Sequence, residues 1–181
     1  MQAIISVDIE TTGLDPQLHS ILEFCAILED RTKEVEDLDN FYTLVLPESG
    51  SWDNITPFIA TFHKDLWPKF QNNYIAKLVA HDVMPTFKQW LDEHDIDKVY
   101  LAGKNVGSFD LQFLKRLPDA HKIRFAHRCY DPGSLFATNA DIEPPSLETC
   151  LSRAGLEPTE LHTAYGDALD VLRVLRVGYG L

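Results

Sequence analysis

The sequence is short of positive charge. Its 16 Lys and Arg residues are outnumbered by 28 Asp and Glu residues, which gives a formal net charge of −12. A protein that coats long nucleic acid by neutralising phosphates normally carries the opposite sign. The composition therefore argues against a non-specific DNA-coating module. It is compatible with an enzyme that holds only a few terminal nucleotides through metal ions and pocket contacts.

Long apolar runs and paired cysteines are also missing. No run approaches the roughly 20 apolar residues of a membrane-spanning helix, and the start, MQAIISVDIE, lacks the basic segment of a signal peptide. Cys25, Cys129 and Cys150 are odd in number and far apart, which argues against a disulfide framework or a C-x-x-C metal site. We therefore expect a cytoplasmic protein that does not associate with membranes. Its 181 residues, 45% of them hydrophobic, fit a single domain over residues 1–181.

The order of the apolar segments is that of an α/β domain. Runs of β-forming residues predict strands at residues 4–10, 20–29, 41–46, 99–102 and 124–130. Helical spacing and capping residues predict helices at residues 79–94, 108–117 (capped by Ser108), 146–155 and 164–176, with a brief one after Asp131. Three successive strands followed by alternating helices and strands predict a mixed five-stranded sheet with helices on both faces.

Residues 47–78 are the least regular part of the chain, because they mix turn residues with aromatic ones. We expect an irregular excursion with one short helix near residues 57–64. Such segments often carry substrate selection, although each aromatic residue could equally be part of the core.

The first predicted strand carries two acids on one face. Asp8 and Glu10 are two residues apart, so their side chains point the same way while Ile9 points to the other face. Neighbouring carboxylates repel one another, and burying either without a partner is unfavourable. A divalent cation such as Mg²⁺ or Mn²⁺ removes this repulsion. Taken alone, D-x-E-T-T-G also fits a solvated acidic turn.

Two more acids and a histidine complete the pattern. Asp110 opens a middle helix, Asp167 opens the last one, and His162 precedes Asp167 by five positions. Acids from three separate segments are what a two-metal phosphodiesterase site needs. A neutral histidine beside the attacking water could accept its proton. Helix starts also favour Asp for dipole reasons, so Asp110 alone does not decide the matter.

Three segments resemble, in order, the motifs of the DEDDh 3′→5′ exonucleases, a family with the ribonuclease H-like fold. They are SVDIETTGLDP, GKNVGSFDLQFL and HTAYGDALDVL, and the resemblance extends from residue 3 to about residue 176. It implies two Mg²⁺ or Mn²⁺ ions bridged by Asp8 and a general base, His162. The other implied metal ligands are Glu10, Asp110 and Asp167, and the implied contacts to the 3′ end are Thr11, Thr12, Gly13, Leu14, Asn105 and Phe109.

One position departs from the family pattern. Asn105 stands five residues before Asp110, whereas many members have Asn four residues before this acid. The loop therefore has one extra residue, which affects the contact expected from Asn105 but not Asp110 as a ligand.

The implied activity is removal of nucleoside 5′-monophosphates from the 3′ end of single-stranded DNA or RNA, with DNA favoured. One alternative is an oligoribonuclease-type enzyme that acts on short RNA. Another is a non-catalytic nucleic-acid-binding or proofreading subunit. No motif reports the sugar preference, a polymerase partner or a homodimer.

A basic run interrupts the acidic composition. Lys115, Arg116, Lys122, Arg124 and Arg128 fall within fourteen residues that contain one acid, Asp119. This run is either a solvated surface or a rail for substrate phosphates.

Overall fold

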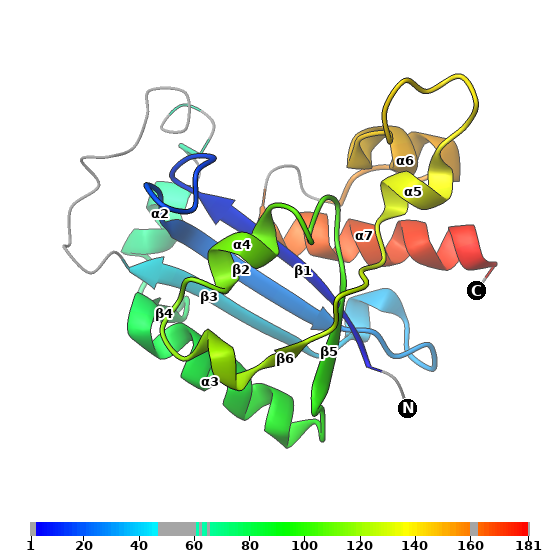
Figure 1. Ribbon diagram of the computed structural model, residues 1–181. Coiled ribbons are helices and arrows are strands. Elements are labelled where there is room, and N and C mark those ends of the chain that lie inside the picture. Colours follow the sequence, from blue (N-terminus) through cyan, green and yellow to red (C-terminus); the bar gives the residue numbers. More distant parts are fainter. Residues whose placement is uncertain (1–2, 47–60, 62, 65, 160–162, 181) are drawn as a thin grey trace.

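The computed structural model describes residues 3–46, 61, 63–64, 66–159 and 163–180. Its strands form one mixed sheet of six, in the order β4-β3-β2-β1-β5-β6 (Figure 1). The strands are β1 (Ile4–Thr11), β2 (Ile21–Leu28), β3 (Asn40–Leu46), β4 (Lys77–Val79), β5 (Lys98–Ala102) and β6 (Arg124–Phe125).

Most of the predicted helices are confirmed, with shifted ends. The α-helices are α2 (Leu66–Gln71), α3 (Ala80–Glu93), α4 (Asp110–Leu114), α5 (Pro132–Phe136), α6 (Leu147–Ala154) and α7 (Ala164–Tyr179), and the 3-10 helices are η1 (Val35–Asp37) and η2 (Ala120–Lys122). Ser146 caps α6 and Gly155 ends it in a left-handed conformation, as expected. None of the described helices combines the length and apolar character needed to cross a membrane.

The sheet is mixed, as predicted, but the predicted strand count is wrong by one. β1, β2 and β3 form an antiparallel meander, and β5 lies parallel to β1. The additional strand, β4, pairs in parallel with β3. It is only three residues long, which is too short for alternating hydrophobicity to show in the sequence.

Two local expectations need correction, and a third cannot be compared with the described residues. Ser108 does not cap α4, because its hydroxyl donates to the carbonyl of Asn105 and the helix begins at Asp110. The predicted strand over residues 124–130 is reduced to β6 and an isolated bridge at Tyr130. The helix expected near residues 57–64 lies largely outside the described residues.

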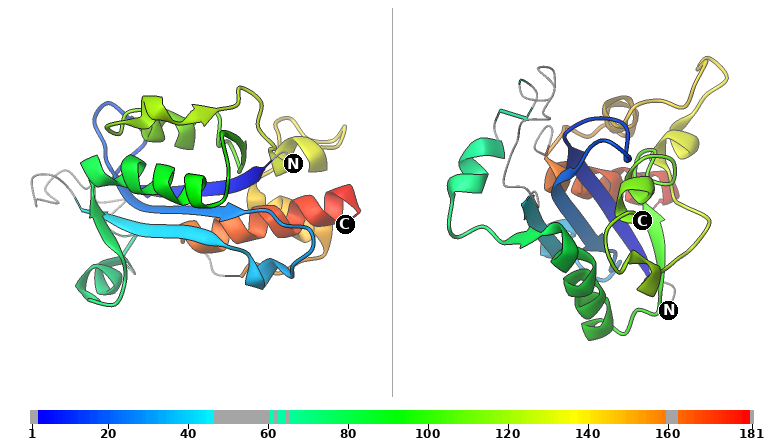
Figure 2. Two further views of the ribbon diagram at one scale, coloured as in Figure 1. Left: turned by 90° about the horizontal axis from the view of Figure 1, so that it is seen from below. Right: turned by 60° about the vertical axis from the view of Figure 1, so that its left-hand side comes forward.

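The two faces of the sheet have different coverings (Figure 2). Ile5, Val7 and Ile9 of β1 pack on the side of α3 and α4. The alternate residues of β1 point toward α7, where the Ser6 hydroxyl donates to the carbonyl oxygen of Ala168 at 2.7 Å. This alternation puts the side chains of the two β1 acids on the α7 side.

An aromatic cluster fixes the α3 side. The ring of Phe87 is wholly buried and lies 5.1 Å from Phe24, 5.3 Å from Phe41 and 5.8 Å from Trp90, measured between ring centroids. Edge and offset contacts of this kind add to the free energy gained by burial. The cluster therefore holds the meander, and with it β1, in place.

Replacing Phe87 with Ala should lower the free energy of unfolding by about 3–5 kcal/mol, because a large cavity would open under the sheet. Denaturant titration measures this change. The matched control is Ile142→Ala, since the Ile142 side chain is fully exposed and its loss should change stability by less than about 0.5 kcal/mol. Equal effects of the two substitutions would contradict this account of the core.

Candidate active site

The site forms where β1 extends beyond the end of the neighbouring strand β5. The pairing of β1 with β5 stops at Ser6 and Ala102. Beyond this point the amide of Ile9 donates to Oδ1 of Asp110 at 3.1 Å. The start of α4 therefore takes the place that a longer β5 would occupy, and it brings a carboxylate to β1.

The structure brings together the four acids singled out in the sequence. Carboxylate oxygens of Asp8, Glu10 and Asp167 all lie within 4.8 Å of one another. Asp110, which is buried, joins them through its bond to the β1 backbone. The first turn of α7, which carries Asp167, is capped by Thr163, whose hydroxyl accepts from the amide of Gly166.

Burial and mutual repulsion oppose ionisation of this cluster. Burial, then the charges of Asp110 and Glu10, raise the pKa of Asp8 well above its usual range. Burial, then the charge of Glu23, raise the pKa of Glu10 to about 8. Burial likewise raises the pKa of Asp110 to about 7 and that of Asp167 to about 6. The four groups cannot all carry charge near neutral pH without a compensating cation.

The donor set fits a divalent metal of the Mg²⁺ or Mn²⁺ type. All the candidate ligand atoms are carboxylate oxygens, which are the hard donors that these ions prefer. Three different elements supply them, so the geometry is set by the fold and not by one local turn. A bound cation would replace the protons that the raised pKa values retain.

Glu23 is a site residue that the motif analysis missed. It is wholly buried on β2, directly opposite Glu10 in the strand pairing. Its Oε2 accepts from the amide of Ala164 at 2.9 Å, while Oε1 accepts from the Tyr42 hydroxyl and from Lys69 Nζ at 3.1 Å. Glu23 thus ties the start of α7, and therefore Asp167, to the sheet. An acid inside an otherwise apolar strand was the available sequence signal.

His63 and Lys69 lie at the site and belong to the irregular segment 47–78, for which the sequence analysis assigned no site residue. Nδ1 of His63 lies 3.4 Å from Oε2 of Glu10, and His63 is 8% exposed. Lys69 belongs to α2 and supplies the cation beside Glu23. Neither residue stands at a spacing that relates it to the acids, so no sequence signal indicated them.

The turn after β1 is held by its own side chains. Thr11 donates its hydroxyl to the carbonyl of Gly13, and the Thr12 hydroxyl accepts from the amide of Ser20. A Cβ on Gly13 would lie 2.2 Å from the ring of His19, so a larger residue there would force that ring to move. These bonds hold the backbone of residues 11–13 directly beside Glu10, consistent with the predicted contact to a 3′ end.

The remaining predicted substrate contacts differ in their surroundings. Leu14 is 78% exposed just past this turn, and Phe109 is partly buried next to Asp110. Asn105 forms a left-handed corner, with φ of 58°. Its side chain accepts from Lys104 Nζ at 2.8 Å. The geometry keeps Leu14 and Phe109 as candidate contacts and gives Asn105 a role in the loop. The predicted general base, His162, lies outside the described residues.

Glu23→Ala should lower the free energy of unfolding by about 2–4 kcal/mol, because the amide of Ala164 and the ammonium of Lys69 would lose a buried acceptor. Glu23→Gln should have a smaller effect, since its amide oxygen can still accept from Ala164. Denaturant titration checks both variants against Glu34→Ala, which alters an exposed residue. A loss no larger than that of Glu34→Ala would contradict the role given to Glu23.

The metal-free protein should become less stable as pH rises from about 4 to about 8. The folded-state pKa values of Asp167, Asp110 and Glu10, about 6, 7 and 8, exceed the value near 4 of an unfolded carboxyl. Within this window the folded state binds more protons than the unfolded state, so stability decreases with pH. In EDTA we expect Tm to fall by several degrees between pH 5 and pH 8, and Mg²⁺ to raise Tm more at pH 8.

The control pair for this experiment is Asp8→Asn and Glu143→Gln. Asp8→Asn should flatten the decline of Tm with pH and remove most of the Mg²⁺ effect. Glu143 is exposed, and its substitution should leave both unchanged. A metal-free Tm that rises over this range would refute the electrostatic description of the cluster.

Comparisons with known proteins identify the family of this chain. The RNase T family model, described as Exonuclease, matches residues 5–175. An oligoribonuclease of Vibrio cholerae is 25% identical over 150 residues, which cover 81% of this chain and 80% of that protein. A PolC-type DNA polymerase III of Thermotoga maritima is 24% identical over 165 residues, or 91% of this chain but 11% of that much longer protein.

The fold also matches a solved structure. This chain superposes on the zinc-bound E. coli ExoI–ssDNA complex with a TM-score of 0.70 at 15% sequence identity. The match covers 98% of this chain and 40% of that one. The resemblance carried by the three motifs is thus confirmed at the level of family and fold, and such exonucleases depend on divalent metal. The chain belongs to the RNase T exonuclease family, with the motifs of its 3′→5′ DEDDh type.

Proposed function

We propose that this exonuclease domain removes nucleoside 5′-monophosphates one at a time from the 3′ end of single-stranded nucleic acid, with two Mg²⁺ or Mn²⁺ ions as cofactors. The observation that carries the proposal is the partly buried cluster of Asp8, Glu10 and Asp167, with oxygens within 4.8 Å of one another, beside the turn of residues 11–13. Asp110 is the fourth ligand in this proposal.

The four carboxylates would hold the two ions. When bound, the ions would lower the pKa of the attacking water and stabilise the charge of the reacting phosphate. The protein's own contribution is position. The bond from Ile9 holds Asp110, and the bond from Ala164 to Glu23 holds the start of α7. Rigid placement of this kind is what lowers the barrier in phosphoryl transfer.

We assign proton removal to His162. It stands one residue before Thr163, the cap of α7, and five residues before Asp167. In this role it takes a proton from the attacking water as the new P–O bond forms. The P–O3′ bond breaks, the leaving O3′ takes a proton from solvent water, and the shortened strand leaves with a free 3′-hydroxyl. The support is the spacing to Asp167 and the family motif.

The turn after β1 suits an unpaired terminal nucleotide. Its backbone is held beside Glu10 by the bonds of Thr11 and Thr12, and exposed Leu14 offers an apolar surface to a base. Stacking on apolar and aromatic surfaces tolerates any base, so we expect little sequence preference. DNA is the favoured substrate in this proposal, and the ssDNA bound in the E. coli ExoI structure supports it.

A second candidate is a short-RNA exonuclease. It is favoured by the Vibrio cholerae oligoribonuclease, because that relative matches along most of both chains. The two candidates share the same chemistry and differ in substrate length and sugar.

We also propose a cytoplasmic location. Cys25, Cys129 and Cys150 are all free, and two of them are buried. Free cysteines are typical of proteins in a reducing compartment.

The test is digestion of 5′-labelled single-stranded DNA and RNA with Mg²⁺, Mn²⁺ or EDTA. We expect stepwise shortening from the 3′ end that requires metal. Asp8→Asn should slow it about a thousandfold or more, because loss of a metal ligand removes several kcal/mol of transition-state stabilisation. Glu143→Gln is the exposed-acid control. Full activity in EDTA or in Asp8→Asn would refute the proposal.

His162→Ala should lower kcat by about 10²–10⁴-fold while the Mg²⁺-induced rise in Tm stays as in the wild type. Loss of the Tm rise would instead place His162 among the groups that hold metal. Comparing dinucleotides with 20-mers, as DNA and as RNA, then separates the two candidate functions by kcat/KM.

A further inference from the structure

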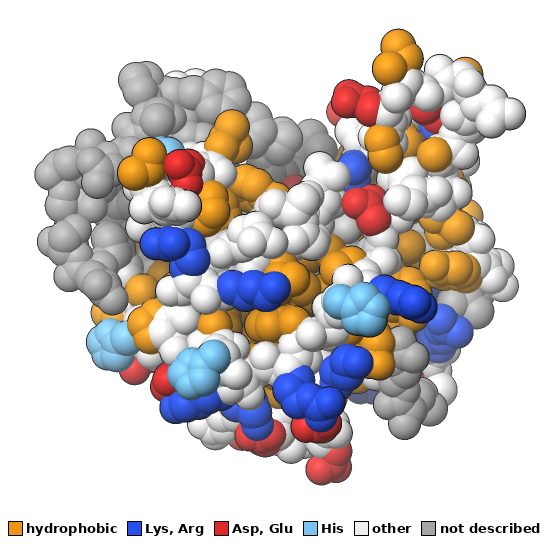
Figure 3. All heavy atoms as spheres, in the orientation of Figure 1, with side chains coloured by type: hydrophobic (Ala, Val, Ile, Leu, Met, Phe, Trp, Pro, Cys, Tyr) orange, Lys and Arg blue, Asp and Glu red, His pale blue; other side chains and the backbone are white. Residues whose placement is uncertain are grey.

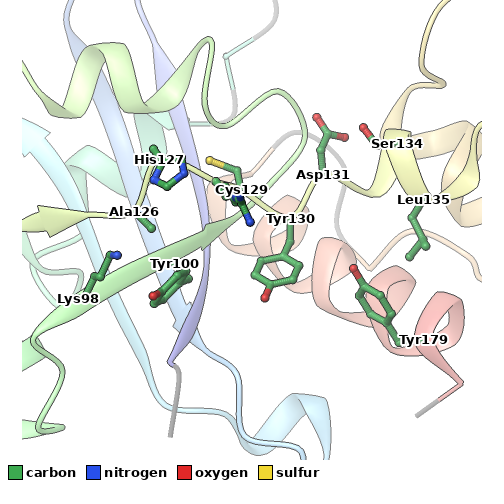
Figure 4. A pocket seen from close by; sticks show the side chains of 11 residues that line it. Lys98, Tyr100, Ala126, His127, Cys129, Tyr130, Asp131, Ser134, Leu135 and Tyr179 are labelled. Carbon is green, nitrogen blue, oxygen red and sulfur yellow. The ribbon is translucent and has the colours of Figure 1, made fainter.

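An open hollow of about 670 Å³ lies on the outer side of β5, away from the acidic cluster. Figure 4 shows its lining side chains, which come from β5, from the chain after β6, from α5 and from α7. Six of them carry the argument: Lys98, Tyr100, His127, Arg128, Tyr130 and Tyr179. The proposed exonuclease chemistry uses none of these residues.

A bulge after β6 shapes the hollow. The amide of Ala126 donates to the carbonyl of Val99, and the amide of Tyr130 donates to that of Leu101, both at 2.8 Å. The chain after β6 thus advances four residues while β5 advances two. Residues 127–129 leave the sheet opposite the single residue Tyr100, and His127 and Arg128 are exposed. Bulges of this kind redirect side chains, here toward a surface lined with aromatic rings.

Three tyrosine rings lie in a row along the hollow (Figure 4). They come from three different parts of the chain, and Tyr179 is 49% exposed. The ammonium of Lys98 lies 5.0 Å from the ring centroid of Tyr100, which places the cation beside the row. Partly exposed rings next to cations can take up a ligand that has both flat faces and negative charge.

The charge that remains available in the hollow is positive. Its carboxylate, Asp131, accepts from the amides of Gly133 and Asn105 at 2.7 and 2.9 Å, with Lys104 Nζ 3.8 Å away. Within the described residues, neither Lys98 nor Arg128 forms an ion pair. Lys, Arg and His side chains gather on this face (Figure 3), although the whole chain has a net charge of −12.

The ion pairs also divide the basic run noted in the sequence. Arg124 pairs with Asp97, and Lys122 pairs with Asp119 at 2.8 Å. Both cations are therefore partly neutralised, whereas Arg128 lines the hollow. The structure thus makes Arg128 a better candidate than Arg124 for contact with a phosphate.

We propose that this hollow binds a segment of single-stranded nucleic acid on the 5′ side of the terminal nucleotide, with bases stacked on the tyrosines and phosphates held by Lys98 and Arg128. The inference rests on the proposed function, which supplies the strand. Stacking on aromatic rings in a basic groove is how single strands are bound without regard to sequence. The loop of residues 103–109 connects the two places, because it bonds to Asp131 through Asn105 and leads to Asp110.

The first test measures binding without turnover. Fluorescence anisotropy in EDTA compares the affinity of a dT 20-mer for the wild type, Arg128→Ala, Tyr179→Ala and the control Arg124→Ala. We expect Kd to rise about five- to tenfold for the Arg128 and Tyr179 variants and less than about twofold for the control. Arg128→Ala should also reduce the slope of log Kd against log salt by about 0.7. Equal Kd values for all four proteins would overturn the proposal.

The second test separates the hollow from the catalytic centre. With Mg²⁺, the Arg128 and Tyr179 variants should keep wild-type kcat and KM on a dinucleotide and show a raised KM on the 20-mer. An equal rise of KM on both substrates would overturn the proposal. If the wild type has no nuclease activity, the proposed function fails, while the anisotropy comparison still decides whether the hollow binds a single strand.

A third measurement distinguishes a nucleic-acid strand from a second copy of this chain as the occupant of the hollow. Ultraviolet cross-linking of a 5-iodouracil-substituted 20-mer should map to peptides that contain Tyr100, Tyr130 or Tyr179. If cross-links fall elsewhere, and Tyr179→Ala changes the mass in solution by light scattering but not the Kd, the hollow is an interface between copies of this chain. That result would overturn the proposal.

Discussion

Repulsion among buried carboxylates is the constraint on which the rest of the structure depends. Left to themselves, Asp8, Glu10 and Asp167 would separate or remain protonated, and their raised pKa values report this tendency. The fold opposes it with hydrogen bonds that hold the elements carrying these acids. The Ser6 hydroxyl bonds to the carbonyl of Ala168 near the start of α7, and Glu23 accepts from the amide of Ala164, its first residue. The unfavourable electrostatics are thus fixed in place by backbone contacts, ready for a cation.

Features that depend on neighbouring residues could be predicted from the sequence, whereas contacts between distant segments could not. The same-face placement of Asp8 and Glu10 is local, because it follows from the alternation of a strand. The motifs located Asp110 and Asp167, and the structure brings both to β1. His63 is different, since its place beside Glu10 depends on the path of a segment without periodicity. β4 was missed because three residues are too few to show alternation. Ser108 was wrongly predicted to cap α4, because its hydroxyl bonds within the preceding turn.

The acidic composition now has a physical meaning that the net charge alone does not give. Part of the negative charge belongs to the buried cluster, where a cation would offset it. The surface of the β5 edge has the opposite character, with Lys98 and Arg128 beside tyrosine rings. A strand that is repelled by most of the molecule would therefore meet attraction mainly along one edge. Such an arrangement can orient a charged polymer without holding it tightly.

The early end of β5 has a consequence for how the site can vary. Asp110 is positioned by its bond to Ile9, not by the length of the loop that precedes it. That loop turns a left-handed corner at Asn105, and the amide of Ile9 holds the acid at β1. The bond that positions Asp110 and the loop that leads to it are therefore independent parts of the site. Insertions between residues 103 and 109 can reshape the surface next to the acids while leaving the spacing of the ligands intact.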